Sequence, residues 1–448
     1  MPDRTAPAAQ ETGRGTAPHG SRLDRWVDAY AARTRGMTAS EIRALFAVAS
    51  RPEVVSLAGG MPFLSALPLD VVGNTLAKLV AERGTVAMQY GSGQGDPGLR
   101  ERIIDVMAPQ QVHAHADDVV VTTGSQQALD LVTRIFVDPG DVVVAEAPSY
   151  VGALGVFRAY QADVVHVPLD DDGLIPEALE EALTRLHREG RRVKLLYTVP
   201  NHHNPAGVTL AESRRARIVE IAQRHGVLVL EDDPYGLLGF DGDPLPSLYS
   251  HNPDGVIYLG SFSKTFAPGF RVGWAVAPHA VREKLVLASE AAILCPSSFS
   301  QMAVTTYLDE HDWKHQVGVF RDLYRERCEA TLHALADLIP QARWTTPHGG
   351  FYVWVTLPEG LDATAMLPRA VTERVAYVPG TAFYADGQGR RNLRLSYCFP
   401  TSERIREGVR RLAGVVEAEL EVLNTFGPAP TDSDDDPPGL SAPGPDLT

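Results

Sequence analysis

Short apolar runs alternate with helix-like stretches between about residue 117 and residue 278. The runs are rich in β-branched residues, as strands are. They predict strands at residues 119–122, 142–145, 164–167, 193–198, 227–231, 256–260 and 272–276. Because this alternation is typical of parallel strands joined by helical crossovers, it predicts an α/β fold with a mostly parallel sheet covered by helices on both sides.

The segment 212–225 is typical of the helices expected between these strands. Ile218, Ile221 and Ala222 fall on one helical face, and Gly226 follows where a helix C-cap is expected. In open α/β sheets, binding crevices lie at the carboxyl ends of the strands. Polar motifs follow several of the runs, so the sequence predicts a binding site along that edge of the sheet.

The pattern changes after Pro296. Long helix-like stretches at 300–308 and 313–338 precede short strands around 350–355 and 393–397. This order predicts a second, smaller α+β domain in the C-terminal part of the chain.

The composition narrows the classes of protein. The formal net charge of −15 argues against unaided nucleic-acid binding, which needs a basic face. The three cysteines, Cys295, Cys328 and Cys398, are scattered, which favours a reducing compartment and neither a disulfide framework nor a zinc site. No stretch approaches the ~20 apolar residues of a membrane span, and residues 1–20 lack the apolar segment of a secretory signal. We therefore expect a cytoplasmic protein without membrane or nucleic-acid partners.

Lys264 differs in its surroundings from the other four of the five lysines. The others fall in charged, helix-like stretches or at the start of a strand; they are Lys78, Lys194, Lys284 and Lys314. Lys264 lies among small residues and hydroxyls, between an apolar strand and a glycine-bearing turn. An amine held in a partly desolvated pocket stays reactive, which makes Lys264 a candidate Schiff-base nucleophile. The alternative is a surface-loop lysine.

The surroundings of Lys264 carry a family resemblance. Ser261-Phe-Ser-Lys264, followed by Gly269-Phe-Arg271-Val-Gly273, resembles the cofactor-lysine signature of fold-type I pyridoxal-phosphate (PLP) enzymes, class I/II aminotransferases in particular. The resemblance extends from about residue 56 to about residue 418, and it is closest to the 2-aminoadipate/kynurenine/aromatic aminotransferase group. It implies that Lys264 holds PLP and acts as the catalytic base and acid, and that Ser261, Ser263 and Arg271 bind the cofactor phosphate.

A second phosphate-binding element follows the strand at 119–122. Gly124, Ser125 and Gln126 open a helix there, and a helix N-terminus offers unpaired N–H groups and a positive dipole end to an anion. Taken alone, Ser125 is better explained as a simple helix N-cap. The resemblance implies that these three residues complete the phosphate site.

An acidic run, Glu231-Asp232-Asp233-Pro234-Tyr235, ends the strand at 227–231. An acid beside a pyridine nitrogen keeps the ring protonated and a better electron sink. The resemblance selects Asp232, three residues before Tyr235, which would bind the ring oxygen O3′. Strand alternation places Glu231 and Asp233 on the opposite face. The alternative is a solvated acidic turn.

Two further strand ends carry candidate cofactor contacts. Asn204 lies in a run that resembles the Asn-Pro-x-Gly element of the family, which implies contact with O3′ and with substrate. Tyr150 is expected to stack on the cofactor ring. An ordinary Asn-Pro turn and a core tyrosine are the alternatives. His202 and His203 raise the question of a metal, but no acid or cysteine stands at ligand spacing, so we expect no metal site.

Arg394 is a single charge in the apolar run 392–397. A guanidinium matches a carboxylate bidentately, and the resemblance implies that Arg394 binds the substrate α-carboxylate. A structural ion pair is the alternative. Gly60, in the run 57–64, and the aromatic run 349–352 are expected to line a pocket for a hydrophobic or aromatic side chain. Arginines that could reach a distal carboxylate are Arg22, Arg25 and Arg35.

Tyr90 opens a glycine-rich segment, 90–100. No apolar strand immediately precedes it and Pro97 interrupts it, so it is not a Rossmann nucleotide loop. In related aminotransferases the corresponding segment reaches the neighbouring active site, which implies a homodimer with Tyr90 on the phosphate of the partner. The alternative is a surface loop with a packed tyrosine.

The resemblance also implies how the chain is divided. Residues 1–22 and the acidic, proline-rich residues 426–448 are expected to be disordered. Residues 23–69 would form an N-terminal arm and part of the small domain. Residues 70–305 would form the large PLP-binding domain, and residues 306–425 the small C-terminal domain.

The expected activity is amino-group exchange between an L-amino acid and a 2-oxo acid such as 2-oxoglutarate or pyruvate, in amino-acid metabolism or biosynthesis. PLP-dependent lyases, decarboxylases and oxidases share the fold and its residues and remain alternatives. A more remote alternative is an aminotransferase-like effector-sensing regulator fused to a DNA-binding domain. About 20 N-terminal residues are too few for such a domain, and the charge has the wrong sign.

Overall fold

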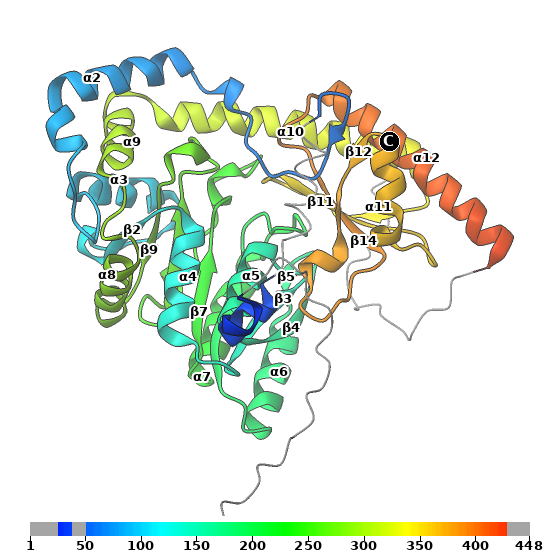
Figure 1. The fold of residues 1–448 in the computed structure, drawn as a ribbon, viewed down its shortest axis with the longest axis horizontal. Helices are drawn as coiled ribbons and strands as arrows, with labels where there is room; N and C mark the ends of the chain where they lie inside the picture. Colours follow the sequence, from blue (N-terminus) through cyan, green and yellow to red (C-terminus); the bar gives the residue numbers. More distant parts are fainter. Residues whose placement is uncertain (1–25, 38–50, 428–448) are drawn as a thin grey trace, which may run out of the picture.

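An eight-stranded sheet forms the centre of the larger part of the molecule in this computed structural model, which describes residues 26–37 and 51–427 (Figure 1). Its spatial order is β2-β9-β8-β7-β6-β3-β4-β5, and β3, β4, β6, β7 and β8 run parallel to their neighbours in that group. The strands are β2 (Val119–Thr122), β3 (Val142–Ala147), β4 (Asp163–Asp170), β5 (Gly173–Leu174), β6 (Val193–Thr198), β7 (Leu228–Asp232), β8 (Val256–Ser261) and β9 (Gly273–Val276). All seven strands predicted from the sequence are therefore confirmed, as is the mostly parallel sheet.

Helices cover both faces of this sheet. Successive residues of one strand enter different cores: Val142 and Val144 pack on one side, and Val143 packs on the other. The first side carries α3 (Pro97–Met107), α6 (Pro176–Arg188) and α7 (Glu212–Arg224), and the second carries α4 (Ser125–Phe136), α5 (Val151–Ala159) and α8 (His279–Ile293). Because both faces are covered, the central strands are apolar throughout, which is why the sequence pattern identified them.

The predicted helix at 212–225 corresponds to α7, which ends at Arg224. Gly226 follows it with φ = 66°, a left-handed conformation that glycine adopts without a Cβ penalty. The chain then turns directly into β7.

A smaller antiparallel sheet forms the second part of the molecule. Its order is β10-β11-β14-β13, and the long helix α10 extends from the first part into the second (Figure 1). The strands are β10 (Arg343–Trp344), β11 (Tyr352–Thr356), β13 (Val378–Pro379) and β14 (Asn392–Ser396). The helices of the C-terminal half are α9 (Ser298–Glu310), α10 (Trp313–Leu338), α11 (Ala363–Thr372) and α12 (Ser402–Phe426).

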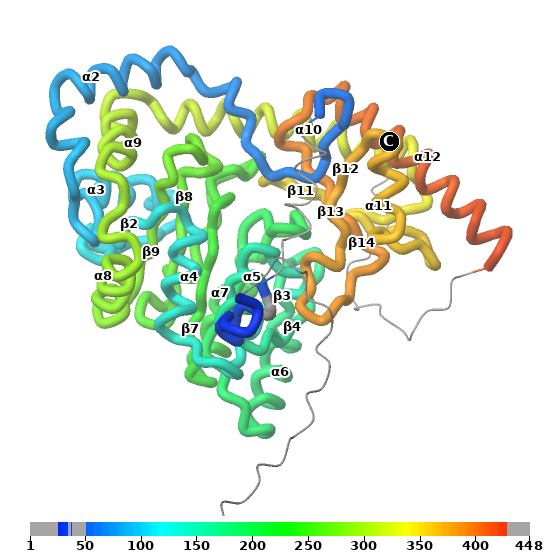
Figure 2. Tube along the Cα trace, viewed as in Figure 1, coloured from blue at the N-terminus to red at the C-terminus, as the bar shows by residue number. Residues whose placement is uncertain are grey.

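The segment before α2 (Leu69–Ala87) lies with this second part. In Figure 2 it runs beside the tube of the second part, near β12 (Val375–Ala376). β1 (Val55–Ser56) pairs in parallel with β12, and Ser396 donates its backbone N–H to Leu57 O. The expected disorder of residues 1–22 and of the tail concerns residues that lie almost entirely outside the described ranges. Within those ranges, no helix is both long and apolar enough to span a bilayer.

The topology brings several motifs to one edge of the large sheet. β8, β7, β6 and β3 are parallel neighbours, so their carboxyl ends lie side by side. β9 runs antiparallel between β8 and β2, so the residue before β9 reaches the same edge as the residues after β2 and β8. Arg271, Ser125 and Lys264 therefore meet there, although they come from different parts of the chain.

Candidate active site

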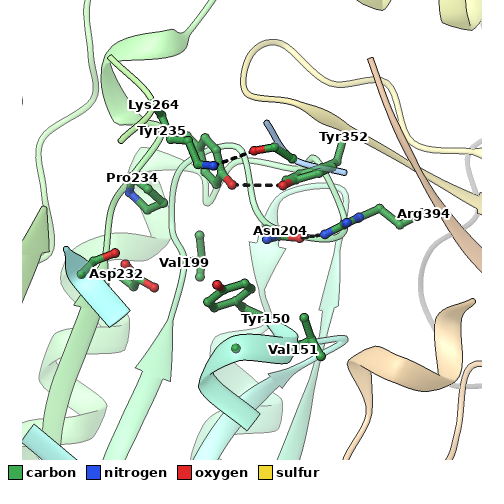
Figure 3. Close-up of a pocket in the computed structure, with 13 residues that line it drawn as sticks. Tyr150, Val151, Val199, Asn204, Asp232, Pro234, Tyr235, Lys264, Tyr352 and Arg394 are labelled. Atoms are coloured by element: carbon green, nitrogen blue, oxygen red, sulfur yellow. Dashed lines mark hydrogen bonds between the residues drawn. The ribbon is translucent and has the colours of Figure 1, made fainter. Parts of the chain in front are cut away.

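A cavity of about 320 Å³ opens at this edge, between the large sheet and the smaller sheet (Figure 3). Lys264, Asp232, Asn204 and Tyr150 reach it from the ends of β8, β7, β6 and β3, and Arg394 reaches it from β14. The wall is completed by Gly60, Ser125, Val151, Gly152, Val199, Pro234, Tyr235 and Tyr352. The structure thus brings together eight residues that the sequence predicted as site residues: Gly60, Ser125, Tyr150, Asn204, Asp232, Tyr235, Lys264 and Arg394.

Lys264 is partly buried, and its Nζ donates a hydrogen bond to Gly60 O at 2.7 Å. Burial lowers the pKa of its amine to about 8, and the guanidinium groups of Arg394 and Arg271 act in the same direction. At pH 7.5 a pKa of 8 leaves about one amine in four neutral, against about one in a thousand at the ordinary lysine value. Lys264 therefore lines a cavity and is not a surface-loop lysine, so that alternative is wrong.

The two carboxylate oxygens of Asp232 differ in their hydrogen bonding. Its Oδ2 accepts the hydroxyl of Tyr197 at 2.9 Å, whereas its buried Oδ1 has no hydrogen-bond partner among the described residues. Burial raises the pKa of the Asp232 carboxyl to about 7; the Tyr197 bond lowers it and the charge of Asp233 raises it. A buried oxygen without a partner is costly, so this arrangement favours a ligand that donates a hydrogen bond to Oδ1.

The two neighbouring acids point elsewhere, as strand alternation predicted. Glu231 accepts the backbone N–H groups of Leu248 and Tyr249, both at 2.9 Å. Asp233 accepts four donors, which are Gln110 Nε2, Asn201 Nδ2, the backbone N–H of Gly236 and the Tyr258 hydroxyl. All three acids are buried, so the alternative of a solvated acidic turn is wrong.

Arg394 is buried and pairs with no carboxylate among the described residues, which excludes the structural ion pair considered from the sequence. Its Nη1 donates to Asn204 Oδ1 at 2.8 Å and its Nη2 donates to Ala58 O at 2.6 Å. The guanidinium lies over the Tyr352 ring, 4.2 Å from its centroid. Because Asn204 turns its oxygen toward Arg394, its amide nitrogen faces the cavity (Figure 3).

A cradle suited to an anion lies beside Ser125, at the N-terminus of α4. Arg271 Nη2 donates to Thr123 O at 3.1 Å, and a Cβ at Gly124 would lie 2.3 Å from that nitrogen. Gly124 also has φ = 80°, so a larger residue there would be strained and would displace the guanidinium. Helix N–H groups with a guanidinium match the charge and donors that a phosphate needs.

Other predicted phosphate and ring residues lie near the cavity but are not part of its wall: Gly124, Gln126, Ser261, Ser263 and Arg271. Ser261 Oγ donates to Ser263 Oγ at 2.9 Å, at the end of β8. The side chain of Gln126 accepts the Tyr150 hydroxyl at 3.3 Å. In this structure, therefore, Gln126 supports Tyr150.

Four residues of the cavity wall were not predicted from the sequence, although their positions shortly after strand ends could have indicated them. Val151, Gly152, Val199 and Pro234 line the cavity and follow the ends of β3, β6 and β7 directly. Conversely, Tyr90 is 78% exposed and does not line the cavity of its own chain. Arg22 and Arg25 lie outside the described residues, as does the side chain of Arg35.

Comparisons with known proteins agree with this geometry. The family model "Aminotransferase class I and II" matches residues 52–412. Aromatic-amino-acid aminotransferase 1 of Thermococcus litoralis is 41% identical over 390 residues, covering 86% of this chain and 93% of the relative. The 2-aminoadipate transaminase of Thermus thermophilus is 39% identical over 403 residues, covering 89% and 99%. A solved structure of a kynurenine aminotransferase from Pyrococcus horikoshii matches with a TM-score of 0.85 and 39% identity, covering 89% of this chain and 100% of that chain.

Proposed function

Because this chain belongs to the class I and II aminotransferases, we propose that it moves an amino group from an L-amino acid with a hydrophobic, aromatic or 2-aminoadipate-like side chain to a 2-oxo acid such as 2-oxoglutarate or pyruvate. The chain is a fold-type I enzyme, its reaction is amino-group transfer, and its cofactor is pyridoxal phosphate. One observation carries the proposal for the site: a single cavity holds the amine of Lys264, the unpartnered oxygen of Asp232 and the unpaired cation of Arg394.

The residues present fit pyridoxal phosphate. Asp232 Oδ1 needs a donor, and the protonated ring nitrogen is one. The cradle formed by Gly124, Ser125 and Arg271 offers donors to the phosphate, with the hydroxyls of Ser261 and Ser263 close by. When bound, the cofactor supplies an electron-accepting ring that stabilises negative charge at the substrate Cα.

The side chains in the cavity suggest which of them would contact the cofactor ring. The carboxylate of Asp232 would keep the ring nitrogen protonated, and a positive charge on that nitrogen would lower the pKa of Asp232 from the value of about 7. Asn204 would offer its free amide N–H to the ring oxygen, because its Oδ1 is occupied by Arg394. The Tyr235 hydroxyl, which donates to the Tyr352 hydroxyl at 3.4 Å in this structure, would be a second donor to the ring oxygen. Tyr150, which donates to Gln126, would pack on the ring.

Lys264 moves the proton. In its neutral form, Nζ would take the proton from the substrate Cα and later return it. Its lowered pKa keeps a usable neutral fraction near neutral pH. Arg394 and Asn204 would hold the α-carboxylate of the substrate in the cavity that also holds Nζ.

Arg394→Ala should lower kcat/KM for amino acids by at least ~10-fold, because a charged bidentate contact contributes roughly 1.5–3 kcal/mol. The unpaired guanidinium in the cavity is the motivating observation. Steady-state kinetics with an amino acid and with a simple amine that lacks the carboxylate measure the effect. The exposed Arg390, altered to alanine, is the matched control. Equal losses for both substrates would make Arg394 a structural residue.

Gly60 brings the substrate side-chain pocket close to Lys264. A Cβ at Gly60 would lie 1.9 Å from the Tyr352 hydroxyl oxygen, so a larger residue there would have to displace the buried Tyr352 side chain. Tyr352 and Val151 add aromatic and apolar surface to the wall, which supports a hydrophobic or aromatic side chain. The names of the two relatives suggest the same range of substrates.

Amino-acid panels with 2-oxoglutarate and with pyruvate test the proposed reaction. Aromatic and aliphatic amino acids and 2-aminoadipate should yield their 2-oxo acids together with glutamate or alanine. Release of ammonia, carbon dioxide or hydrogen peroxide in the absence of a 2-oxo acid would instead indicate a lyase, a decarboxylase or an oxidase, respectively. An enzyme active only with short acidic amino acids would contradict the proposed side-chain preference.

The exposed apolar face around Tyr90 supports a homodimer in which Tyr90 binds the phosphate of the partner. The segment 90–93 packs against 290–298, since a Cβ at Gly91 would lie 2.6 Å from Ser298 Oγ. Exposed apolar residues lie on α2 and α8 and on the segments that follow these helices: Val80, Val86, Met88, Tyr90, Leu287, Ile293 and Leu294. Such a patch on one chain marks an interaction surface.

Light scattering should give twice the chain mass if the homodimer forms. Mixing inactive Lys264→Ala and Tyr90→Ala chains should restore activity, because each hybrid contains one site with both residues. A monomer, or mixtures without recovery from two inactive parents, would contradict the proposal.

We also infer a cytoplasmic location from the free cysteines Cys295, Cys328 and Cys398, which cell fractionation would test.

A further inference from the structure

A buried acid–imidazole pair lies just outside the wall of the active-site cavity. Glu146 belongs to β3, and His203 lies in the loop after β6 that also carries Asn204. Both residues are 1% exposed. The sequence raised His203 only as a metal question, and no step of the proposed reaction uses either residue.

The carboxylate of Glu146 joins three points of the polypeptide. Its Oε1 accepts the Thr198 hydroxyl at 2.8 Å, and its Oε2 accepts the backbone N–H of Val199 at 2.8 Å. His203 Nε2 lies 3.1 Å from the same Oε2. A buried carboxylate is stable only when donors surround it. The hydrogen bonds to Glu146 therefore hold this cluster together.

The donors around His203 define the proton position on its ring. Nδ1 accepts the backbone N–H of Ala206 at 3.2 Å, so the hydrogen of a neutral ring must be on Nε2. Glu146 Oε2 is the acceptor within reach of Nε2, although the N–H direction is not well aligned in this structure. The backbone of His203 is fixed as well, because its N–H donates to Val208 O and its C=O accepts the Gly207 N–H.

The pair connects directly to residues that line the cavity. Asn204 follows His203, Val199 is bound by Glu146 itself, and Tyr150 stands four residues after Glu146. The orientation of Asn204 toward the cavity depends on this loop, since Arg394 holds only its oxygen. A shift of the loop would therefore move the amide donor away from the ring oxygen.

We propose that Glu146 and His203 are positioning residues that hold Asn204 and Val199 against the cofactor ring. This inference rests on the proposed contact between Asn204 and the ring oxygen. The pair acts through Asn204. When the Asn204 amide N–H donates to the ring oxygen, the ionised form of that oxygen is favoured; when the amide has moved away, the ionised form is disfavoured.

His203→Ala should weaken cofactor binding about 10-fold, because the buried Glu146 carboxylate loses the imidazole that lies 3.1 Å away and the adjoining loop relaxes. It should also raise the pH at which the visible absorbance of the bound cofactor changes. Titration of the cofactor-free protein with pyridoxal phosphate measures the first effect, and a spectrophotometric pH titration measures the second. His203→Gln, which keeps a donor, should recover part of both, and Glu146→Gln should resemble His203→Ala.

The pair formed by His225 and Glu180 is a matched control. Its imidazole and carboxylate lie 2.9 Å apart; Glu180 belongs to α6, His225 directly follows α7, and neither lines the cavity. His225→Ala should leave cofactor affinity and the spectral pH unchanged. The proposal is overturned if His203→Ala lowers only the melting temperature of the cofactor-free protein, with affinity and spectrum as in the wild type.

If His203→Ala does not fold, His203→Gln and Glu146→Gln can be measured in the same way. Wild-type cofactor affinity and a wild-type spectral pH in both of these variants would also overturn the proposal. The effects of His203→Ala and Glu146→Gln should be non-additive in the double variant, because the two side chains act as a unit. Failure of the proposed function looks different: the wild-type protein itself would take up no cofactor.

Discussion

Lys264→Ala is expected to lower kcat by about 10²–10⁴-fold or more, because the variant loses both the covalent attachment point and the group that moves the proton. The structure places Nζ in the cavity, and burial lowers the pKa of this amine to about 8. The fold should survive, since among the described residues Nζ makes one hydrogen bond, to Gly60 O. Steady-state kinetics and the loss of the yellow colour of the bound cofactor measure the result.

Borohydride reduction of the wild-type protein, followed by peptide mapping, identifies the attached residue. The label should appear on Lys264 and be absent from Lys264→Ala. Lys284→Ala is the matched control, because Lys284 is exposed on α8 and does not line the cavity. A label on another lysine, or on none, would end the assignment of Lys264.

Asp232→Asn is expected to retain cofactor but to lose about 10²-fold or more in kcat, because a neutral amide no longer holds the ring nitrogen protonated. An asparagine oxygen still accepts the Tyr197 hydroxyl, so the packing around residue 232 should persist. Cofactor content by absorbance and kcat by a coupled assay separate retention from turnover.

Asp233→Asn should have the opposite profile. The carboxylate of Asp233 accepts four buried donors and does not line the cavity. Its replacement should cost about 1–3 kcal/mol of stability with turnover per folded molecule close to that of the wild type. Thermal unfolding measures the cost. If Asp233→Asn were the catalytically impaired variant and Asp232→Asn the merely unstable one, the roles of the two acids would be reversed.

The strand positions followed from the sequence because central strands of a covered sheet are apolar on both faces. The runs at 119–122 and 193–198 coincide with β2 and β6. The period of two in a strand was also enough to separate Asp232 from Glu231 and Asp233. The sequence likewise located Lys264, Asn204 and Tyr150 at strand ends, where a parallel sheet builds its binding edge.

The partners of these residues were decided by the tertiary structure. Arg394 meets Asn204 across 190 residues, and Lys264 meets Gly60 across 204. Four donors from separate segments surround Asp233, so a substitution that alternation alone would suggest to be mild is expected to be destabilising.

His203 provides the clearest contrast. Nothing near it in the sequence indicated an acid, yet Glu146 reaches it from the neighbouring strand β3. Local periodicity determines which residues form strands and helices and which side chains share a face. The order of strands in a sheet and the side chains that meet between segments depend instead on packing across the whole fold, because buried polar groups take whichever partners that packing brings within hydrogen-bond distance.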